Sequence, residues 1–595
     1  MRRLPGGRWD HNQTGFLVLK TSIHMFSNIR PLFFLIGLAS CIITFAQEHM
    51  SKGELTYVES LYVHTDRESY LTGETLWFKA YVLDRDRLTL SRLSKVAYIE
   101  LLDRENRPVI QQKVVLENGV GSGSMYLPVS MQTSGYALRG YTRWMQNFGP
   151  EGFFRKTLTV INPLTRFVSV SDTARTDFSC GLLLDSVERQ RVVNASKGFD
   201  FSLNHSSFKK RDKVELRISL SEPFDTKSFV HASIAVHQVD SLDKYSNPLM
   251  AGYLSQRSDF PSANEEMRYQ PEYEGGRISG SLTTSCAEMK LGNRLLFLHS
   301  AGEQVLLYAT RSGADGQFQF IVDEVIRDPL ITVPADSLDC YRVNIQPVYS
   351  DRFACKGIAP FRLHPDDLEK IRQRSLNMQI QHAFAADFSL DSLMVHSNVF
   401  GTAMVEYDLD DYTRFATLEE IMREYVSEVT VKNDKEEVNF RVIDGQSYPA
   451  FHADPLILIN GVPEMDKTYI ASLDPYKMEN IRVIDDKFGI GNAVFYGVIM
   501  IQTKESNPHL SKRKGSFSSY TPSRSFNSPG YEDERLRQSQ KPDFRTLLHW
   551  NPSLVFQKPS YDVSFYTSDI AGTYVGLVQG VDQKGNVATA RFTFT

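Results

Sequence analysis

The chain has 595 residues, of which 42% are hydrophobic and 23% are charged, and its formal net charge is −5. The length exceeds what one hydrophobic core can organise and indicates about four domains, with a composition that is usual for a folded protein. A charge so close to neutral argues against a nucleic-acid-binding protein, which needs a basic surface. The aromatic share of 11%, with 27 Tyr and 37 Phe, favours a mainly β fold.

An apolar run near the N-terminus extends from Pro31 to Ala46 and is followed by the polar residues 47–49. It is shorter than the ~20 residues of a membrane-spanning helix, so residues 1–46 are interpreted as the signal peptide of an exported protein. Cleavage after Ala46 and a lipid anchor at Cys41 both fit this sequence. We expect the former, because the apolar run continues past Cys41, and we expect no transmembrane span in the mature chain.

Cleavage after Ala46 would leave four cysteines, which are Cys180, Cys286, Cys340 and Cys355. Exported proteins meet an oxidising environment, where disulfides are allowed. Cys340 and Cys355 are close enough in sequence to be a plausible pair, and free buried thiols are an equal alternative. The cysteine spacing does not indicate a zinc site.

Residues 47–165 are predicted to form a β-sandwich. Short alternating runs, such as residues 76–82 and 97–102, recur about every ten residues and are separated by turn residues. Gly73 lies between two such runs, where a turn would use a positive φ angle.

Two stretches of this segment carry a resemblance to a known domain. Residues 62–80, which read YVHTDRESYLTGETLWFKA, resemble the MG2 domain of the alpha-2-macroglobulin superfamily, and residues 135–144, GYALRGYTRW, are similar to its late strand. Within the first stretch, Asp66 and Arg67 are expected to form at most an exposed ion pair, worth ~0–1 kcal/mol. The resemblance implies a structural module.

Two further β modules and a connector are predicted downstream. Residues 166–262 alternate in the manner of strands and are expected to form a second β-sandwich. Residues 276–350 resemble a carboxypeptidase regulatory-like β-sandwich, mainly at 278–282 and 312–320. Residues 351–414 are expected to be a connector.

The connector contains a predicted helix over residues 366–383. Its apolar residues recur at helical spacing and are expected near one face. These residues are Leu368, Ile371, Leu376 and Ile380.

Residues 415–506 are predicted to form a small α+β domain. A helix over 417–426 would begin with a capping box, in which Thr417 and Glu420 pair. Strands are expected at 456–459, 478–484 and 497–502, with a strong turn signal directly after the first of them.

The sequence of this domain resembles the plug domain of TonB-dependent outer-membrane receptors. The similarity lies between Asp454 and Lys504, which includes DPLILINGVP at its start and YGVIMIQTK at its end. The resemblance implies a protein-contact surface on this domain. Its candidate residues are Asn460, Gly461, Phe488, Gly489, Tyr496 and Gly497.

Receptors of this kind enclose the plug in a barrel of ~22 strands that follows it in sequence. The segments that follow here are a predicted flexible linker at 507–540 and a C-terminal macroglobulin-like module at 541–595, which leave no room for such a barrel. The C-terminal module is also small for a sandwich, so we expect it to need earlier strands or to pack on the plug-like domain.

The motifs of common enzyme classes are missing from the sequence. We find no Gly-x-Ser-x-Gly, His-Glu-x-x-His or phosphate-binding loop. Protease-trapping macroglobulins use a thioester within Gly-Cys-Gly-Glu-Gln, whereas residues 300–304 read SAGEQ, with Ala301 in the place of the cysteine. We therefore predict no catalytic residues, no cofactor and no metal site, and a protein that is not an enzyme.

The order of these modules resembles a family of Bacteroidetes envelope proteins with macroglobulin-like domains and a plug-like domain that lacks a barrel. The resemblance implies a non-enzymatic protein in the periplasm or at the outer membrane, with peripheral membrane association left open. Its plug-like domain would bind a protein partner, either an outer-membrane barrel or an envelope complex for TonB-dependent transport or secretion. The alternative is a surface adhesin or a degenerate protease-binding macroglobulin without a thioester.

Overall fold

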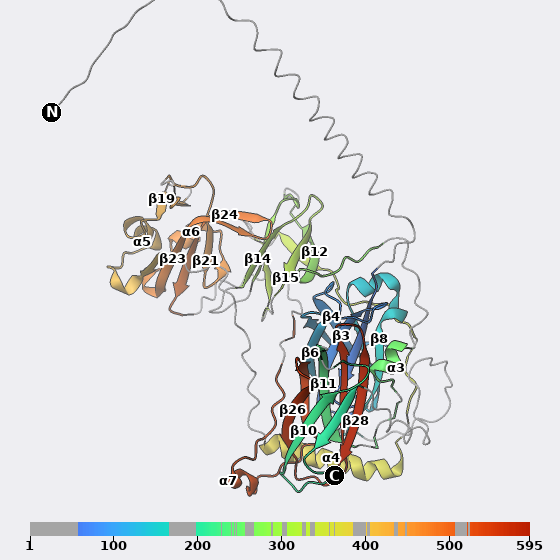
Figure 1. Cartoon of the computed structure of the whole chain (residues 1–595). Coiled ribbons are helices and arrows are strands. Elements are labelled where there is room, and N and C mark those ends of the chain that lie inside the picture. Colours follow the sequence, from blue (N-terminus) through green and yellow to red (C-terminus); the bar gives the residue numbers. More distant parts are fainter. Residues whose placement is uncertain are drawn as a thin grey trace, which may run out of the picture. The chain divides into compact units, whose positions relative to one another are not determined.

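The computed structural model describes residues 57–165, 198–255, 267–384 and 400–595, with short gaps inside the last three ranges, of which 506–519 is the longest. The predicted signal peptide and Cys41 lie outside these residues. The described chain is mainly β, as the composition predicts (Figure 1). Among the described residues, no helix has both the length and the apolar character needed to cross a membrane.

The first β-sandwich occupies the segment predicted from its alternating runs. Its strands are β1 (Glu59–Thr65), β2 (Ser69–Leu71), β3 (Thr75–Asp84), β4 (Val96–Leu102), β5 (Pro108–Val115), β6 (Val120–Tyr126), β7 (Ser134–Tyr141) and β8 (Phe154–Ile161). They form two sheets with the orders β1-β3-β6 and β2-β8-β7-β4-β5. Gly73 has a φ of 94° in the turn between β2 and β3, as its position predicts. Two short 3-10 helices, η1 (Trp144–Phe148) and η2 (Pro150–Gly152), lead into β8.

The second β-sandwich combines strands from two distant parts of the chain. They are β9 (Phe199–Leu203), β10 (Lys213–Leu220), β11 (Val230–Gln238), β25 (Leu547–Phe556), β26 (Ser560–Tyr566), β27 (Tyr574–Asp582) and β28 (Val587–Phe594). The sheet orders are β26-β10-β9 and β25-β11-β27-β28. Figure 1 shows the green strands β10 and β11 beside the red C-terminal strands.

This arrangement differs from the predicted one, in which residues 166–262 and 541–595 were separate modules. Both sets of strands contribute to one apolar core, with Val214 and Ile234 from the first set and Leu554 and Val578 from the second. Neither segment alone has enough apolar surface to close a core, in agreement with the expectation that the C-terminal segment needs earlier strands. Because β11 and β25 are antiparallel neighbours, residues 239–546 are an insertion into this sandwich.

The third β-sandwich lies within the insertion. Its strands are β12 (Gly276–Thr284), β13 (Leu295–His299), β14 (Leu307–Arg311), β15 (Gln317–Val322), β16 (Leu330–Thr332) and β17 (Tyr341–Ile345), in sheets ordered β15-β12-β17 and β14-β13-β16. Side chains of β15 alternate between buried and exposed, so that Phe318 and Phe320 enter the core.

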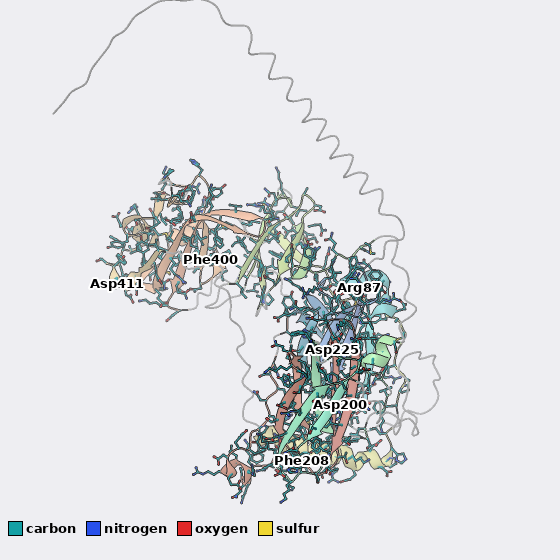
Figure 2. All side chains as sticks on the ribbon, in the orientation of Figure 1. Arg87, Asp200, Phe208, Asp225, Phe400 and Asp411 are labelled. Carbon is teal, nitrogen blue, oxygen red and sulfur yellow. A yellow bond between two sulfur atoms is a disulfide. The ribbon has the colours of Figure 1, made fainter. Side chains whose placement is uncertain are left out.

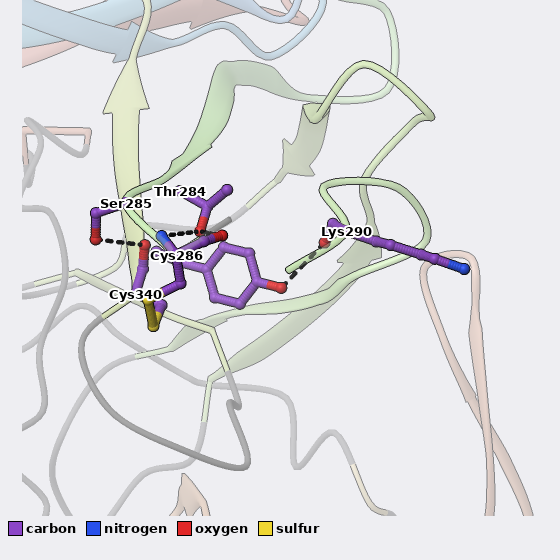
Figure 3. The surroundings of a disulfide bond; sticks show 6 residues. Thr284, Ser285, Cys286, Lys290 and Cys340 are labelled. Carbon is purple, nitrogen blue, oxygen red and sulfur yellow. Dashed lines mark hydrogen bonds between the residues drawn. A yellow bond between two sulfur atoms is a disulfide. The ribbon is translucent and has the colours of Figure 1, made fainter. Parts of the chain in front are cut away.

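A disulfide joins Cys286 to Cys340 beside this sandwich (Figure 3). The expected pairing of Cys340 with Cys355 is therefore wrong. The cause is the antiparallel pairing of β12 with β17, which places Thr284 opposite Tyr341 and so brings the two flanking cysteines to a Cα–Cα distance of 5.5 Å. Cys355 also takes part in a disulfide, and Cys180 lies outside the described residues.

The connector helix α4 (Pro365–Phe384) forms where the sequence predicts it, but it packs through a different face. Leu368 and Leu376 are 42% and 51% exposed, so only Ile371 of the predicted apolar stripe is buried in full. The buried residues of α4 are Asp367, Ile371 and Ser375, so two of the three are polar. Asp367 accepts a hydrogen bond from the Lys244 side chain at 2.7 Å. A shorter helix, α3 (Met250–Ser255), precedes the third sandwich.

The α+β unit has one five-stranded sheet with the order β18-β23-β24-β21-β22. Its elements are β18 (Val405–Asp408), η3 (Leu409–Asp411), α5 (Leu418–Glu424), β19 (Val429–Asn433), β20 (Val438–Val442), β21 (Leu456–Ile459), β22 (Val462–Pro463), α6 (Lys467–Ala471), η4 (Pro475–Lys477), β23 (Met478–Ile490) and β24 (Ala493–Thr503). The predicted capping box of Thr417 and Glu420 is present at the start of α5. Ile421 of α5 packs with Phe440 and Ile501 in the core of the unit.

The described part of the segment predicted as a flexible linker, 507–540, begins at Tyr520 and contacts two of the sandwiches. The Tyr520 hydroxyl donates to the Val322 carbonyl at 2.8 Å and accepts from the Gly276 N–H at 2.6 Å. Phe526 makes an edge contact with Trp77 of the first sandwich, and a short helix, α7 (Glu534–Arg537), follows. The prediction of a linker rests on the polar composition of the segment and does not take account of two of its aromatic residues, Tyr520 and Phe526, which contact the sandwiches.

Candidate functional site

Asn460 and Gly461 form the turn between β21 and β22. Their φ angles are 50° and 79°, as a two-residue hairpin turn of the primed type requires. The Asn460 Oδ1 accepts from the Thr503 N–H at 2.9 Å, and its Nδ2 donates to the Thr503 Oγ1 at 2.6 Å. Gly461 is buried. These two residues therefore fasten the turn to the end of β24.

Phe488 and Gly489 lie in the outer part of the β23–β24 hairpin. The Phe488 ring is half-buried and lies 5.1 Å from the Phe400 ring. Gly489 is exposed, and a Cβ added to it would meet nothing within 4 Å. The hairpin itself packs on the third sandwich, because Phe495 stacks on Phe297 at a ring distance of 5.8 Å. Much of its apolar surface is therefore already covered within the chain.

Tyr496 and Gly497 follow on β24, where the sheet meets the β19–β20 ribbon. Tyr496 is half-buried, with its ring 5.8 Å from Phe451 and the Lys487 Nζ 5.6 Å above it. Gly497 has a φ of 91°, and a Cβ at this position would lie 2.5 Å from the Val442 Cβ. Glycine here allows the ribbon to lie directly against the sheet.

The six predicted residues do not form one surface. Gly497 and Thr503 are six residues apart on β24, which corresponds to roughly 20 Å along a strand. The Asn460–Gly461 turn therefore lies near one end of the sheet and the other four residues lie toward the other end. Within that second group Gly489 is exposed, Phe488 and Tyr496 are half-buried, and Gly497 is buried.

A more exposed aromatic group lies elsewhere on the α+β unit, where no pattern in the sequence indicates it. Tyr476 in η4 is 66% exposed, and the Arg414 guanidinium lies 6.0 Å from its ring. The Arg414 Nη1 donates to the carbonyls of Pro475 and Met478, the latter at 3.0 Å. The arginine is therefore held rigidly beside the tyrosine.

Asp410 completes this group by accepting hydrogen bonds from Arg414 and from the Lys504 Nζ, the latter at 2.9 Å. The hydrogen bonds from Lys504 and Arg414 hold the pKa of Asp410 below its ordinary value. We refer to Asp410, Arg414, Tyr476 and Lys504 as the Tyr476 corner. Figure 2 labels the adjoining Asp411 at the outer edge of the α+β unit.

A row of half-buried aromatic rings comes from the same loop and from the end of α5. The Tyr425 ring lies 4.8 Å from Tyr412 and 5.5 Å from Phe415. Tyrosine and arginine are enriched in the cores of protein–protein interfaces, where they bury much area at a small entropic cost. The sequence signal for this surface was weak, since Tyr476 is one of 27 tyrosines and only its exposure distinguishes it.

The motif that carries the MG2 resemblance is buried rather than exposed. The Asp66 carboxylate accepts from the Tyr70 hydroxyl and from the Trp77 N–H, each at 2.8 Å. Arg67 pairs with Asp66 at 3.0 Å and also donates to the Thr546 Oγ1 at 2.8 Å, just before β25. The expectation of an exposed Asp66–Arg67 pair is therefore wrong, because Tyr70 and Trp77 enclose the carboxylate within the first sandwich.

Within the described part of the chain, no group of three or more His, Cys, Asp or Glu side chains lies close enough to hold a metal ion. Residues 300–304, where a thioester would lie, are outside the described residues.

No protein-family model and no curated protein matches the chain. Among solved structures it is similar to Escherichia coli alpha-2-macroglobulin activated by porcine elastase, with 8% identity, a TM-score of 0.23 and coverage of 90% of this chain and 43% of that one. Salmonella alpha-2-macroglobulin reacted with methylamine gives 8% identity, a TM-score of 0.23 and coverage of 92% and 40%. The Escherichia coli adhesin FdeC gives 12% identity, a TM-score of 0.14 and coverage of 52% and 66%. The chain thus spans about two fifths of the length of the macroglobulins that it matches.

Proposed function

We propose that this chain is an exported, non-enzymatic protein of the bacterial envelope that acts by binding another protein. The observation that carries the proposal is the Tyr476 corner, where a tyrosine that is 66% exposed lies beside a rigidly held arginine. The α+β unit that presents it has its own apolar core, with Phe440 and Ile481 buried completely. It can therefore offer this surface without a partner to complete its fold.

The partner that we propose is an outer-membrane barrel protein, with this chain as an accessory component of TonB-dependent transport or secretion. The resemblance of Asp454–Lys504 to receptor plug domains supports this proposal. On this view the unit contacts its barrel from outside the pore, through the Tyr476 corner and the neighbouring aromatic row.

The test is co-purification of the tagged full-length protein from its native envelope after mild cross-linking. The variant Tyr476→Ala is compared with Tyr126→Ala, which removes a tyrosine that is 53% exposed on β6 of the first sandwich. Loss of an interface tyrosine typically costs ~2 kcal/mol or more, which is about a 30-fold weaker complex. We expect Tyr476→Ala to lose an outer-membrane barrel protein that wild type and Tyr126→Ala both retain. Equal recovery with both variants contradicts the proposed surface.

The second candidate function is that of a surface adhesin or of a protease-binding protein without a thioester. It is favoured by the three β-sandwiches that make up most of the described chain and by Ala301, which stands in the place of the thioester cysteine in the sequence. The same purification separates the two candidates. Recovery of a protease or a host surface ligand, independent of Tyr476, supports this second function.

A further inference from the structure

The first and second sandwiches meet at a buried polar seam. Four side chains from β1 and β3 face two side chains from β11 and β27, and each of the six residues is at most 3% exposed. The seam consists of Tyr62, His64, Lys79, Tyr81, Ser233 and Gln579. Interfaces between sandwiches are usually apolar, so this concentration of reactive and titratable groups requires a reason.

Ser233 and Gln579 are direct neighbours across the sheet. The antiparallel register of β11 and β27 places their Cα atoms opposite each other. Side chains that are directly opposite lie on one face of the sheet, with Cβ atoms ~5 Å apart. The Ser233 hydroxyl and the Gln579 carboxamide therefore share the same part of the seam.

The Ser233 hydroxyl has a base beside it. The His64 Nδ1 lies 2.7 Å from the Ser233 Oγ. The Tyr81 hydroxyl lies 2.8 Å from the same Oγ and 3.2 Å from the Gln579 main-chain carbonyl. When Tyr81 donates its single proton to the Ser233 Oγ, the serine proton is left to point at His64. Burial lowers the pKa of His64, so its imidazole is neutral and able to accept a proton.

The Gln579 carboxamide is polarised. Its Oε1 accepts from the Tyr62 hydroxyl at 3.0 Å and from the Met250 N–H at 2.9 Å. A main-chain N–H can only donate, which identifies the accepting atom as the oxygen. Two donors on a carbonyl oxygen stabilise the negative charge that develops there when a nucleophile attacks the carbon.

The nitrogen of the same carboxamide is poorly accommodated. Among the described residues the Gln579 Nε2 has no hydrogen-bond partner, and neither does the His64 Nε2. A buried donor without an acceptor costs free energy, so loss of this nitrogen would remove that cost from the folded protein.

We propose that Ser233 and Gln579 form an intramolecular ester that ties β11 to β27. The Ser233 Oγ attacks the Gln579 Cδ while the His64 Nδ1 takes the hydroxyl proton. The Cδ–Nε2 bond then breaks, and the nitrogen receives that proton and leaves as ammonia. One C–O bond replaces one C–N bond, with no change in oxidation state and no further reactant.

The position of the ester gives it a consequence for the whole chain. β11 precedes the insertion at 239–546 and β27 follows it, so the bond would close the second sandwich covalently across the insertion. The seam excludes water, which would protect the ester from hydrolysis. An exported protein gains resistance to pulling and to proteolysis from such a bond, whichever partner it binds.

Two other nucleophiles compete for the same carbonyl carbon. Thr589 is opposite Gln579 on β28, and its Oγ1 is buried without a hydrogen-bond partner among the described residues. Lys79 is the other, although its Nζ donates to the Ala232 carbonyl at 3.0 Å. Neither has the base that Ser233 has in His64.

The test is intact-mass measurement of the reduced and denatured full-length protein, followed by peptide mapping. We expect a peptide pair that joins Ser233 to Gln579 and weighs about 17 Da less than its two peptides together, from the loss of one ammonia. Mapping of the N-terminal peptide accounts separately for the ammonia that Gln47 loses if it cyclises. Hydroxylamine should cleave the pair, because esters react with it and amides resist. Ser233→Ala should restore the full mass, whereas Thr589→Val should not.

Four results would overturn the proposal. The first is an unmodified Gln579 peptide in the wild-type protein, and the second is a link that maps to Thr589. The third is a link that resists hydroxylamine, as an amide to Lys79 would, and the fourth is a deficit of about 17 Da at Gln579 that persists in Ser233→Ala. If Ser233→Ala fails to fold, the mapping and hydroxylamine results on the wild-type protein decide by themselves.

Discussion

The Arg374 Nη2 on α4 donates to the Glu74 Oε2 at 2.7 Å, and the two side chains are only 10% and 9% exposed. Glu74 lies in the turn before β3, and its other oxygen, Oε1, is 3.7 Å from the Arg67 Nη1. Arg374 also donates to the Ser69 carbonyl at 3.0 Å. A helix that the sequence indicates only as a connector is therefore bound to the first sandwich by a buried ion pair.

Removal of one partner of this pair is expected to be costly. Arg374→Ala leaves a buried carboxylate with one fewer cation, and loss of one member of a buried pair typically destabilises a protein by about 3–5 kcal/mol. The free energy of unfolding in urea measures the change. The matched control is Arg217→Ala, since the Arg217–Asp562 pair has side chains that are 62% and 67% exposed, and we expect no resolvable change there.

The same pair predicts a dependence of stability on pH. Burial raises the pKa of Glu74, but the charges of Arg374 and Arg67 and the hydrogen bonds from Arg374 and the Leu71 N–H outweigh it and hold that pKa below its ordinary value. Stability from the ionised carboxylate is therefore present above about pH 4.3 and is lost as the pH falls through the folded-state pKa. Urea unfolding of wild type should weaken more between about pH 5 and 3 than that of Glu74→Gln. Parallel pH profiles contradict the ion pair.

The disulfide predicts both a peptide pair and a loss of stability. Non-reducing peptide mapping should recover Cys286 joined to Cys340 and no link from Cys340 to Cys355. The bond spans 54 residues, and the chain-entropy model assigns about 4 kcal/mol to a loop of that length. The double variant Cys286→Ser with Cys340→Ser should lose stability of that order in urea. A variant that keeps its full stability would show that the third sandwich does not depend on the bond.

Two glycines on the β23–β24 hairpin should differ in how much stability an alanine substitution costs. Gly497→Ala meets the Val442 Cβ and requires a positive φ, which together should cost about 2–4 kcal/mol. Gly489→Ala enters open space and should change stability by less than about 0.5 kcal/mol. Thermal or urea unfolding of the two variants compares the positions directly. Similar losses at both would contradict the packing of the β19–β20 ribbon on β24.

Lys79 in the polar seam predicts a second pH dependence. Burial lowers its pKa from 10.5 to about 7. Between about pH 7 and 10 the unfolded chain binds more protons at this lysine than the folded protein, so wild-type stability should rise with pH in that range. Lys79→Met lacks this contribution, and its stability at pH 7 should equal or exceed that of wild type.

The measurement is urea unfolding of wild type and Lys79→Met at several pH values from about 7 to 9.5, where the stability of wild type should gain on that of the variant. Lys213→Met is the control, because the Lys213 side chain is 45% exposed. Its difference from wild type should stay constant over this range. A constant difference for Lys79→Met as well would mean that Lys79 is hydrated in the folded protein.

The features that the sequence predicted correctly are local ones. The positive φ of Gly73, the turn at Asn460–Gly461 and the capping box of Thr417 and Glu420 are all present. Each depends on residues within a few positions of one another, where the allowed backbone angles and the nearest hydrogen-bond donors decide the outcome. Alternation of apolar and polar residues likewise indicated most strands and the mainly β class.

Contacts between distant segments were decided by the tertiary structure alone. β11 pairs with β25 and β27 across more than three hundred residues, because only together do these strands close an apolar core. That closure brings Thr546 to Arg67 and creates the seam at Ser233 and Gln579. The exposure of Tyr476, which carries the proposed function, is also a tertiary property, because it depends on how the other elements of the α+β unit pack. Sequence periodicity determines which side of a strand is apolar, whereas the surface that covers that side depends on every other module in the chain.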